Sequence, residues 1–315
     1  MGRAPLYSPR GMRILVTGTS GAVGAALTRS LVGAHELRAL SRDPARVDAP
    51  PGVELVRGDA VSGDGLDEAL AGVEVAYYLI HSMEPAGPAS FVERDRTAAR
   101  QFAAAAAGAG VRRIVYLGGL LPSGGTQSAH LASRAEVEAI LLDAVPASVS
   151  LRASIVIGSR SQSFRAIVHL VERLPVMPLP PWRRFHTQPI DERDAVAYLA
   201  AAASATGIEG ESLDIAGPEV LSYGAMIERI AALLLRPRAL TPVPSAFGAL
   251  GTAFAARVSG TPTELLGPLM ASLDGDLLAD DARARERFGV RLHGFDAAVE
   301  HALRDWEALE PGRAR

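Results

Sequence analysis

Three glycines at a spacing of three residues, Gly18, Gly21 and Gly24, constrain the fold of this chain more than any other feature. They lie between an apolar run at 12–17, typical of a short buried parallel strand, and a helix expected over 22–32. In a strand–turn–helix context, this pattern is typical of dinucleotide binding. The first glycine permits the tight turn, the second lets the backbone approach a pyrophosphate, and the third brings the helix close to the strand. The sequence therefore predicts a phosphate site at the start of this helix.

Strand and helix patterns alternate from here to about residue 158. We expect strands at 36–41, 53–57, 74–80, 112–118 and 149–155, and helices at 65–71, 90–109 and 129–143. Alternation of this kind implies an α/β fold with a parallel sheet and helices on both faces. The predicted architecture is a doubly wound Rossmann fold.

The pattern loosens beyond this point, where a proline-rich stretch at 175–182 is followed by a series of helix patterns. We expect a cofactor-binding Rossmann domain over 12–158 and a smaller, mostly helical region over 159–315 that holds a substrate or a partner. The sequence leaves open whether part of that region returns to the first sheet. Residues 1–11 are expected to form a flexible leader.

The end of the second expected strand bears on which dinucleotide binds. A carboxylate about 20 residues beyond the glycine loop usually bonds the ribose of NAD, whereas an arginine accommodates the 2′-phosphate of NADP. Here the strand ends in Ser41 and Arg42, which offer a hydroxyl and a guanidinium to a phosphate. This favours NADP(H). Asp43 follows directly and keeps NAD(H) open as the alternative.

Further cofactor contacts are expected where the third and fourth strands end, because the carboxyl ends of parallel strands share one edge of the sheet. Asp59 is expected to meet the adenine edge, with a helix cap or turn as its structural alternative. The backbone at the end of the fourth strand is expected beside the cofactor. The expected binding residues of the loop and the strand ends are Gly18, Ser20, Gly21, Ala22, Val23, Gly24, Ser41, Arg42, Asp59, Ala60, Leu79, Ile80 and His81.

Several longer stretches resemble one group of proteins. The loop at 17–24 is similar to that of the extended and atypical branches of the short-chain dehydrogenase/reductase superfamily. The stretches 77–83, 95–120, 130–141, 151–164, 187–199 and 214–227 narrow the resemblance to the NmrA-like proteins and the accessory complex I subunit. The resemblance runs from about residue 12 to about residue 275. It implies a Rossmann fold, NADP(H) binding and oxidoreductase activity.

The catalytic positions depart from the pattern of that superfamily. Its typical members use a serine with a tyrosine and a lysine four residues apart, and the lysine lowers the pKa of the tyrosine. The matching helix start here carries His130 and Arg134, and the segment 117–120 holds no serine. The chain contains no lysine, since its 32 lysine-plus-arginine positions are all arginine. Coding bias explains an arginine in place of lysine, but not a histidine in place of tyrosine.

Two interpretations of these positions stay open. In the first, His130 is the general acid, because the ordinary pKa of histidine near 6.5 suits proton donation at neutral pH. Arg134 then keeps the ribose hydrogen bonds and His81 helps to polarise a carbonyl, which predicts an NADPH-dependent reductase of a small apolar carbonyl, enone or quinone-like substrate. In the second, the chain binds NADPH and serves as a redox sensor or an assembly or partner-binding protein. His130 as a surface residue of the helix start is the structural alternative.

The segments 159–164 and 175–182 are expected to form loops that line the substrate site. Their apolar side chains favour an apolar or aromatic substrate, although a small interaction surface would have the same composition. These side chains are Phe164, Val176, Met177, Leu179 and Trp182.

The amino-acid composition excludes several further classes of function. The absence of cysteine excludes disulfides, thiol nucleophiles and cysteine-ligated metals, and the histidines show no metal-ligand spacing. A net charge of −3 does not favour nucleic-acid binding. Pro242 and Pro244 break the uncharged run between Arg238 and Arg257, which argues against a membrane span and leaves peripheral membrane contact open. We expect a cytoplasmic monomer or homodimer whose partner is a small-molecule substrate or a protein.

Overall fold

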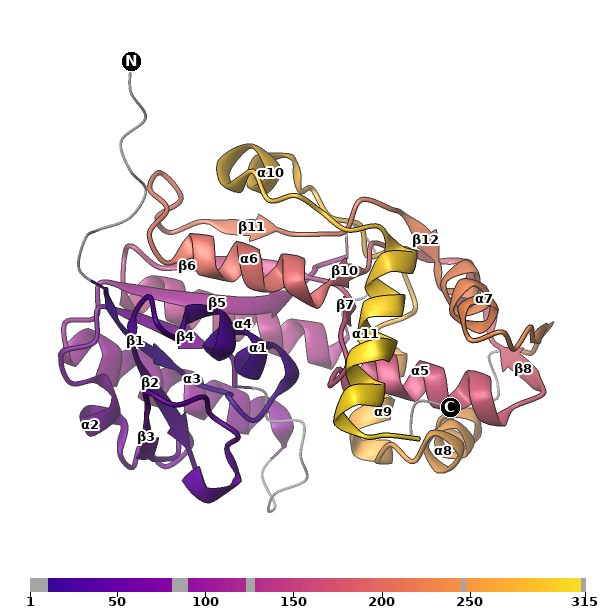
Figure 1. The fold of residues 1–315 in the computed structure, drawn as a ribbon, viewed down its shortest axis with the longest axis horizontal. Coiled ribbons are helices and arrows are strands. Elements are labelled where there is room, and N and C mark those ends of the chain that lie inside the picture. The colour runs from indigo at the N-terminus through magenta and orange to yellow at the C-terminus, as the bar shows by residue number, and fades with distance from the viewer. Residues whose placement is uncertain (1–10, 81–89, 123–127, 245–247, 313–315) are drawn as a thin grey trace.

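The computed structural model describes residues 11–80, 90–122, 128–244 and 248–312 (Figure 1). At its centre is a sheet of seven parallel strands in the order β11-β6-β5-β4-β1-β2-β3. The strands are β1 (Arg13–Val16), β2 (Glu36–Ser41), β3 (Val53–Arg57), β4 (Val75–Tyr78), β5 (Arg113–Gly119), β6 (Val149–Ala153) and β11 (Ser212–Asp214). The chain winds outward in one direction from β1 and in the other from β4, so the crevice where the strand order reverses lies between these two strands.

Helices cover both faces of this sheet. Leucines of α1 and the apolar face of α6 pack on one side of β1, and α2, α3 and α4 pack on the other. The helices are α1 (Ala22–Leu31), α2 (Leu66–Leu70), α3 (Phe91–Gly108), α4 (Ala129–Ala144) and α6 (Glu192–Ala202). This confirms the doubly wound Rossmann fold predicted from the sequence.

The chain returns to this sheet after residue 158. Helix α6 packs on α1, and β11 pairs with β6 as the edge strand of the sheet. The smaller region therefore consists of two separated stretches of chain, before and after this return. It lies beside the carboxyl ends of the strands (Figure 1).

The smaller region is mostly helical and has its own apolar core. Its helices are α5 (Gln162–Arg173), α7 (Tyr223–Leu233), α8 (Gly248–Ser259), α9 (Thr263–Ala271) and α11 (Phe295–Leu309), while α10 (Ala282–Phe288) lies near β11. Short elements connect them: β7 (Val156–Ile157), β8 (Val176–Leu179), β9 (His186–Thr187), β10 (Ile190–Asp191), β12 (Leu221–Ser222), β13 (Ala239–Pro242) and the 3₁₀ turn η2 (Pro181–Arg184). A further 3₁₀ turn, η1 (Pro44–Arg46), lies between β2 and β3. None of the helices in the described part of the chain is long and apolar enough to cross a bilayer.

The loops expected at 159–164 and 175–182 differ from the structure. Helix α5 begins at Gln162, and Phe164 is fully buried in the core of the smaller region. Phe164, Val168 and Val171 recur at helical spacing, and this period was obscured by the polar residues around it. Residues 176–179 form β8, which pairs in parallel with β13.

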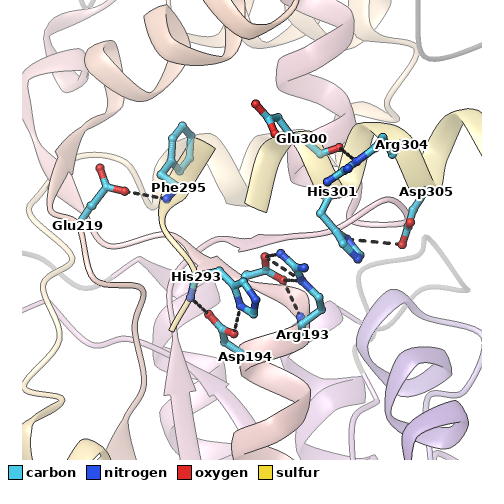
Figure 2. Close-up of polar contacts among 10 residues, drawn as sticks. Arg193, Asp194, Glu219, His293, Phe295, Glu300, His301, Arg304 and Asp305 are labelled. Atoms are coloured by element: carbon cyan, nitrogen blue, oxygen red, sulfur yellow. Dashed lines mark hydrogen bonds and ion pairs between the residues drawn. The ribbon is translucent and has the colours of Figure 1, made fainter. Parts of the chain in front are cut away.

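The start of α6 holds the C-terminal segment in place. The backbone N–H of His293 donates to Oδ2 of Asp194 at 2.8 Å, and Nδ1 of His293 lies 2.6 Å from Oδ1 of the same carboxylate (Figure 2). Asp191 caps the helix by accepting from the N–H of Arg193 at 2.8 Å. These acidic residues at the helix start are therefore structural.

Candidate active site

The glycine loop is pressed between the end of β4 and the start of α1. The hydroxyl of Thr17 donates to the carbonyl of Tyr77 and accepts from the N–H of Leu79, each at 3.0 Å. Gly18 has a φ of 67°, and a Cβ at this position would lie 2.4 Å from the carbonyl oxygen of Leu79. A Cβ on Gly24 would lie 2.3 Å from the carbonyl oxygen of Gly18. Neither position accepts a side chain without moving backbone.

Gly21 has a different role, because it stands exposed at the N-cap of α1. Its φ of −81° is accessible to any residue, and a Cβ here would meet only the carbonyl oxygen of Gly18, at 3.2 Å. The exposed Ser20 precedes it, and the half-buried Ala22 and Val23 follow in the first turn. The free backbone N–H groups of this helix start and its positive dipole end fit the pyrophosphate of a dinucleotide.

Two arginines stand at the end of β2. Arg42 is exposed, and the Oγ of Ser41 accepts from the N–H of Asp43 at 3.2 Å. The carboxylate of Asp43 lies 3.2 Å from Nε of Arg46, a residue that the sequence analysis did not single out. Arg46 partly neutralises Asp43 and adds a second guanidinium beside the place expected for the 2′-phosphate.

The residues after β3 and β4 lie at the same edge of the sheet. One carboxylate oxygen of Asp59 accepts from the N–H of Val61 at 2.8 Å, so Asp59 holds a turn, which was the structural alternative for it. Ala60 is buried. Leu79 and Ile80 are half-buried, with the Leu79 carbonyl against the glycine loop. His81, expected beside the cofactor and expected to help polarise a carbonyl, lies outside the described residues.

His130 lies in the first turn of α4, which Ser128 caps by accepting from the N–H of Leu131 at 3.3 Å. Its side chain lines a cavity of about 1380 Å³ that extends from the carboxyl ends of β5 and β6 into the smaller region. Gly119 and Ala153 contribute the walls on the sheet side. His130 is therefore a cavity residue and not a surface residue of the helix start.

Part of the segment expected to form the substrate wall lines this cavity. Met177, Leu179 and Trp182 line the cavity. Val176, the neighbour of Met177 along β8, is 47% exposed because successive side chains of a strand point to opposite sides. Phe164 is buried in the core instead. The cavity wall is thus assembled from one face of β8, from α5, which directly precedes it, and from helices that follow much later in the chain.

The environment of His130 changes its protonation state. Burial and the nearby guanidinium of Arg134 lower the pKa of His130 to about 4, against an opposing effect of Asp95. Its imidazole is therefore neutral at pH 7, and the premise of an ordinary pKa near 6.5 was wrong. A neutral imidazole still donates a hydrogen bond through one ring N–H.

Arg134 lies in the interior, between α3, β5 and α4. Its Nη2 atom is 3.1 Å from Oδ2 of Asp95, and the hydroxyl of Ser133 donates to the same oxygen at 3.2 Å. All three residues are buried. Burial also raises the pKa of Tyr116, whose hydroxyl lies 3.5 Å from the Arg134 carbonyl. This cluster fixes α4 on α3 and thereby fixes His130, whereas the ribose contact expected for Arg134 stays a prediction.

Sequence analysis missed Asp95, although a signal was present. The buried residues Ala98, Ala99 and Phe102 follow it at three, four and seven positions, so the carboxylate stands on the apolar face of α3. A buried carboxylate requires a partner. That this partner is Arg134 could not be predicted, because Arg134 belongs to a helix that begins more than thirty residues later in the chain.

Gly119 lies in the segment 117–120, where typical short-chain dehydrogenases would carry the catalytic serine and this chain has none. A Cβ at this position would lie 3.2 Å from Cδ2 of Leu131, and Gly119 borders the cavity. The first turn of α4 therefore packs closely on this strand end. A larger residue at this position would push Leu131 aside.

Known proteins resemble this chain in the cofactor domain and in the overall fold. Residues 18–155 match the family model described as NAD(P)H-binding. The (4-alkanoyl-5-oxo-2,5-dihydrofuran-3-yl)methyl phosphate reductase of Streptomyces griseus subsp. griseus is 28% identical over 232 residues, which cover 71% of this chain and 74% of that protein.

Two crystal structures have the same fold along nearly the whole chain. That of gox2253 has a TM-score of 0.74 at 19% identity and covers 97% of this chain and 100% of its own. That of a short-chain dehydrogenase/reductase superfamily protein from Agrobacterium tumefaciens, with bound NAD, has a TM-score of 0.68 at 20% identity. It covers 96% of this chain and 100% of its own.

Proposed function

We propose that the chain, whose residues 18–155 match the NAD(P)H-binding family model, is an atypical, NmrA-like short-chain dehydrogenase/reductase that uses NADPH to reduce an apolar carbonyl, enone or quinone-like substrate. One observation carries this proposal. His130 borders a large apolar cavity at the same edge of the sheet as the glycine loop. A hydrogen-bond donor, an apolar cavity and a phosphate-binding loop thus lie along the same edge of the sheet, the edge at which ligands of such sheets bind.

In the proposed reaction, separate parts of the site bind the cofactor, donate the proton and exclude water. NADPH, when bound, supplies a hydride for the substrate carbon. The glycine loop and the start of α1 hold the pyrophosphate, and Arg42 and Arg46 hold the 2′-phosphate. The N–H of His130 donates to the substrate oxygen and passes it a proton as negative charge develops there, and solvent replaces that proton. The apolar cavity excludes water from the reacting carbon.

The relative from Streptomyces griseus supports the substrate class. Its name describes a reductase of an oxo-dihydrofuran that carries an alkanoyl group and a methyl phosphate group, so that substrate combines a carbonyl with an acyl chain and a charged end. The cavity of the present chain offers walls suited to such a chain, for example Met177, Leu179 and Ile227. His130, a polar group at the sheet end of the cavity, is suited to the carbonyl.

The reductase proposal is tested by NADPH oxidation with a panel of quinones, enones and aldehydes. We expect consumption of NADPH with at least one apolar member of each reactive class and little with polar analogues of the same carbonyl. The low pKa of His130 favours a second candidate, an NADPH-binding sensor without an ionised proton donor. The absence of turnover across the panel, together with an NADPH-dependent change in oligomeric state, would establish that second function instead.

The cofactor preference is tested at Arg42. We expect NADPH to bind more tightly than NADH, and Arg42→Ala to weaken NADPH about fivefold while leaving NADH unchanged, since contacts of exposed charges are worth about 1 kcal/mol. Isothermal titration measures both affinities. Arg291→Ala removes another exposed arginine and serves as the matched control. Equal affinities of the unaltered chain for the two cofactors would remove the NADPH assignment.

A further inference from the structure

The cavity beside His130 is larger than a small carbonyl compound requires. Its volume is about 1380 Å³. Pockets that bury drug-sized ligands usually measure about 300–1,000 Å³. A small quinone or enone placed at His130 would leave most of this space without a partner.

Polarity is distributed unevenly along the cavity. His130 and Ser154 lie at the end formed by the sheet, where the cofactor site is. Two charged residues of the described lining, Arg184 and Asp274, are exposed and therefore stand at the rim. Most of the remaining wall consists of apolar side chains from four helices and a strand, among them Ile167, Leu170, Met177, Met226, Ile227 and Leu266. The hydroxyl side chains of Ser163, Tyr223, Thr252, Thr263 and Ser272 also border it.

A mainly apolar wall of this kind suits the hydrocarbon chain of a ligand better than it suits water. A water molecule held in a cavity needs two to four polar partners. Away from the sheet end and the rim, the described wall offers single hydroxyl groups set among apolar side chains. An apolar ligand that displaces this water gains free energy in proportion to the surface it buries. Three methionines of the lining, Met177, Met226 and Met270, are unbranched and flexible, so they adapt to a ligand of variable shape.

We propose that the substrate carries a long apolar chain, with its carbonyl at His130 and the chain extending between α5, α7 and α9. The position of the reactive group rests on the reductase function proposed above. The length of the chain rests on the cavity alone. The substrate class is thus an amphipathic carbonyl compound of the size of a medium- to long-chain acyl derivative.

The proposal is tested with the alkan-2-ones from 2-hexanone to 2-dodecanone, titrated into the full chain without cofactor. Trp182 lines the cavity, whereas the second tryptophan, Trp306, is buried in the core, so ligand entry is read from Trp182 fluorescence. Trp182→Phe is the signal control. We expect the Kd to fall about fourfold with each added methylene, the equivalent of about 0.8 kcal/mol per buried CH₂. A Kd independent of chain length would overturn the proposal.

A glycine in the wall allows the cavity to be shortened without damage to the fold. Gly267 lies within α9, lines the cavity, and a Cβ there would meet nothing within 4 Å. Gly267→Leu therefore extends into open space, and leucine favours the helix more than glycine does. Gly108→Leu is the matched control, since this exposed glycine also lies in a helix with nothing within 4 Å of its Cβ position.

We expect Gly267→Leu to abolish the gain in affinity for the longest ketones and to leave 2-hexanone unaffected, while Gly108→Leu changes neither. Equal weakening of all ketones by both variants would overturn the proposal. The two proposals fail separately. Binding that depends on chain length, without NADPH oxidation, refutes the reductase function and supports the long-chain cavity. Turnover that depends neither on chain length nor on Gly267→Leu supports the reductase function and refutes the long-chain cavity.

Discussion

Replacement of His130 by phenylalanine is expected to lower kcat by about 10²- to 10³-fold, the usual effect of removing one hydrogen-bond donor from a developing oxyanion. Phenylalanine suits the apolar cavity, so the fold and the affinity for NADPH should be retained. His130→Gln keeps a neutral N–H donor and is expected to retain part of the activity. Steady-state rates with the best substrate of the ketone, enone and quinone panel measure both variants.

The pH dependence separates a neutral donor from an ionised one. Because burial and Arg134 lower the pKa of His130 to about 4, the neutral imidazole is present throughout the neutral range. We therefore expect kcat/KM to show no ionisation of this histidine between about pH 5 and about pH 8. An inflection near pH 6.5 that disappears in His130→Gln would contradict this role. Equal rates for all three proteins would remove His130 from the mechanism.

The second large effect is expected at Gly21. Gly21→Ala should weaken NADPH about tenfold to a hundredfold, because a methyl group at the N-cap of α1 keeps the pyrophosphate from backbone N–H groups worth about 1.5–3 kcal/mol each to a charged partner. The backbone conformation of Gly21 is accessible to alanine, so the fold should survive. Titration calorimetry gives the affinity, and thermal unfolding without cofactor gives the stability.

Two other glycines provide the comparison for this result. Gly108→Ala places the same methyl group in an exposed helical position and should change neither quantity. Gly24→Ala forces a contact with the backbone of Gly18 and should lower stability as well as affinity. If Gly21→Ala binds NADPH as tightly as the unaltered chain, the pyrophosphate does not lie at the start of α1.

The elements of the Rossmann half could be read from local patterns. The strands expected at 36–41 and 53–57 form over those same residues, and the expected helix at 129–143 differs by one residue from α4. Buried parallel strands are short apolar runs, and their periodicity survives without knowledge of neighbours. Helix α5 was missed because prolines and serines around it resemble a loop, although its apolar residues follow a helical period.

The candidate site was harder to read. The sequence placed His130 and Arg134 on one helix and predicted an ordinary pKa for the histidine. The structure places Arg134 in an ion pair with Asp95 and leaves His130 at the cavity wall. Four residues of spacing on a helix show that two side chains share a face, but not what lies opposite that face.

The sequence by itself determined the doubly wound sheet and the glycine cradle, because each depends on residues close together in the chain. A positive φ at Gly18 and the close approach at Gly24 are steric requirements that glycine alone meets. Only the tertiary structure decided the size of the cavity, its continuity with the sheet edge and the neutral state of His130 at pH 7. These properties arise where α4 packs against α3, which precedes it, and against α9, which begins more than one hundred residues after it. Burial sets both the volume of the apolar cavity and the pKa of His130, and burial exists only once these segments have packed together.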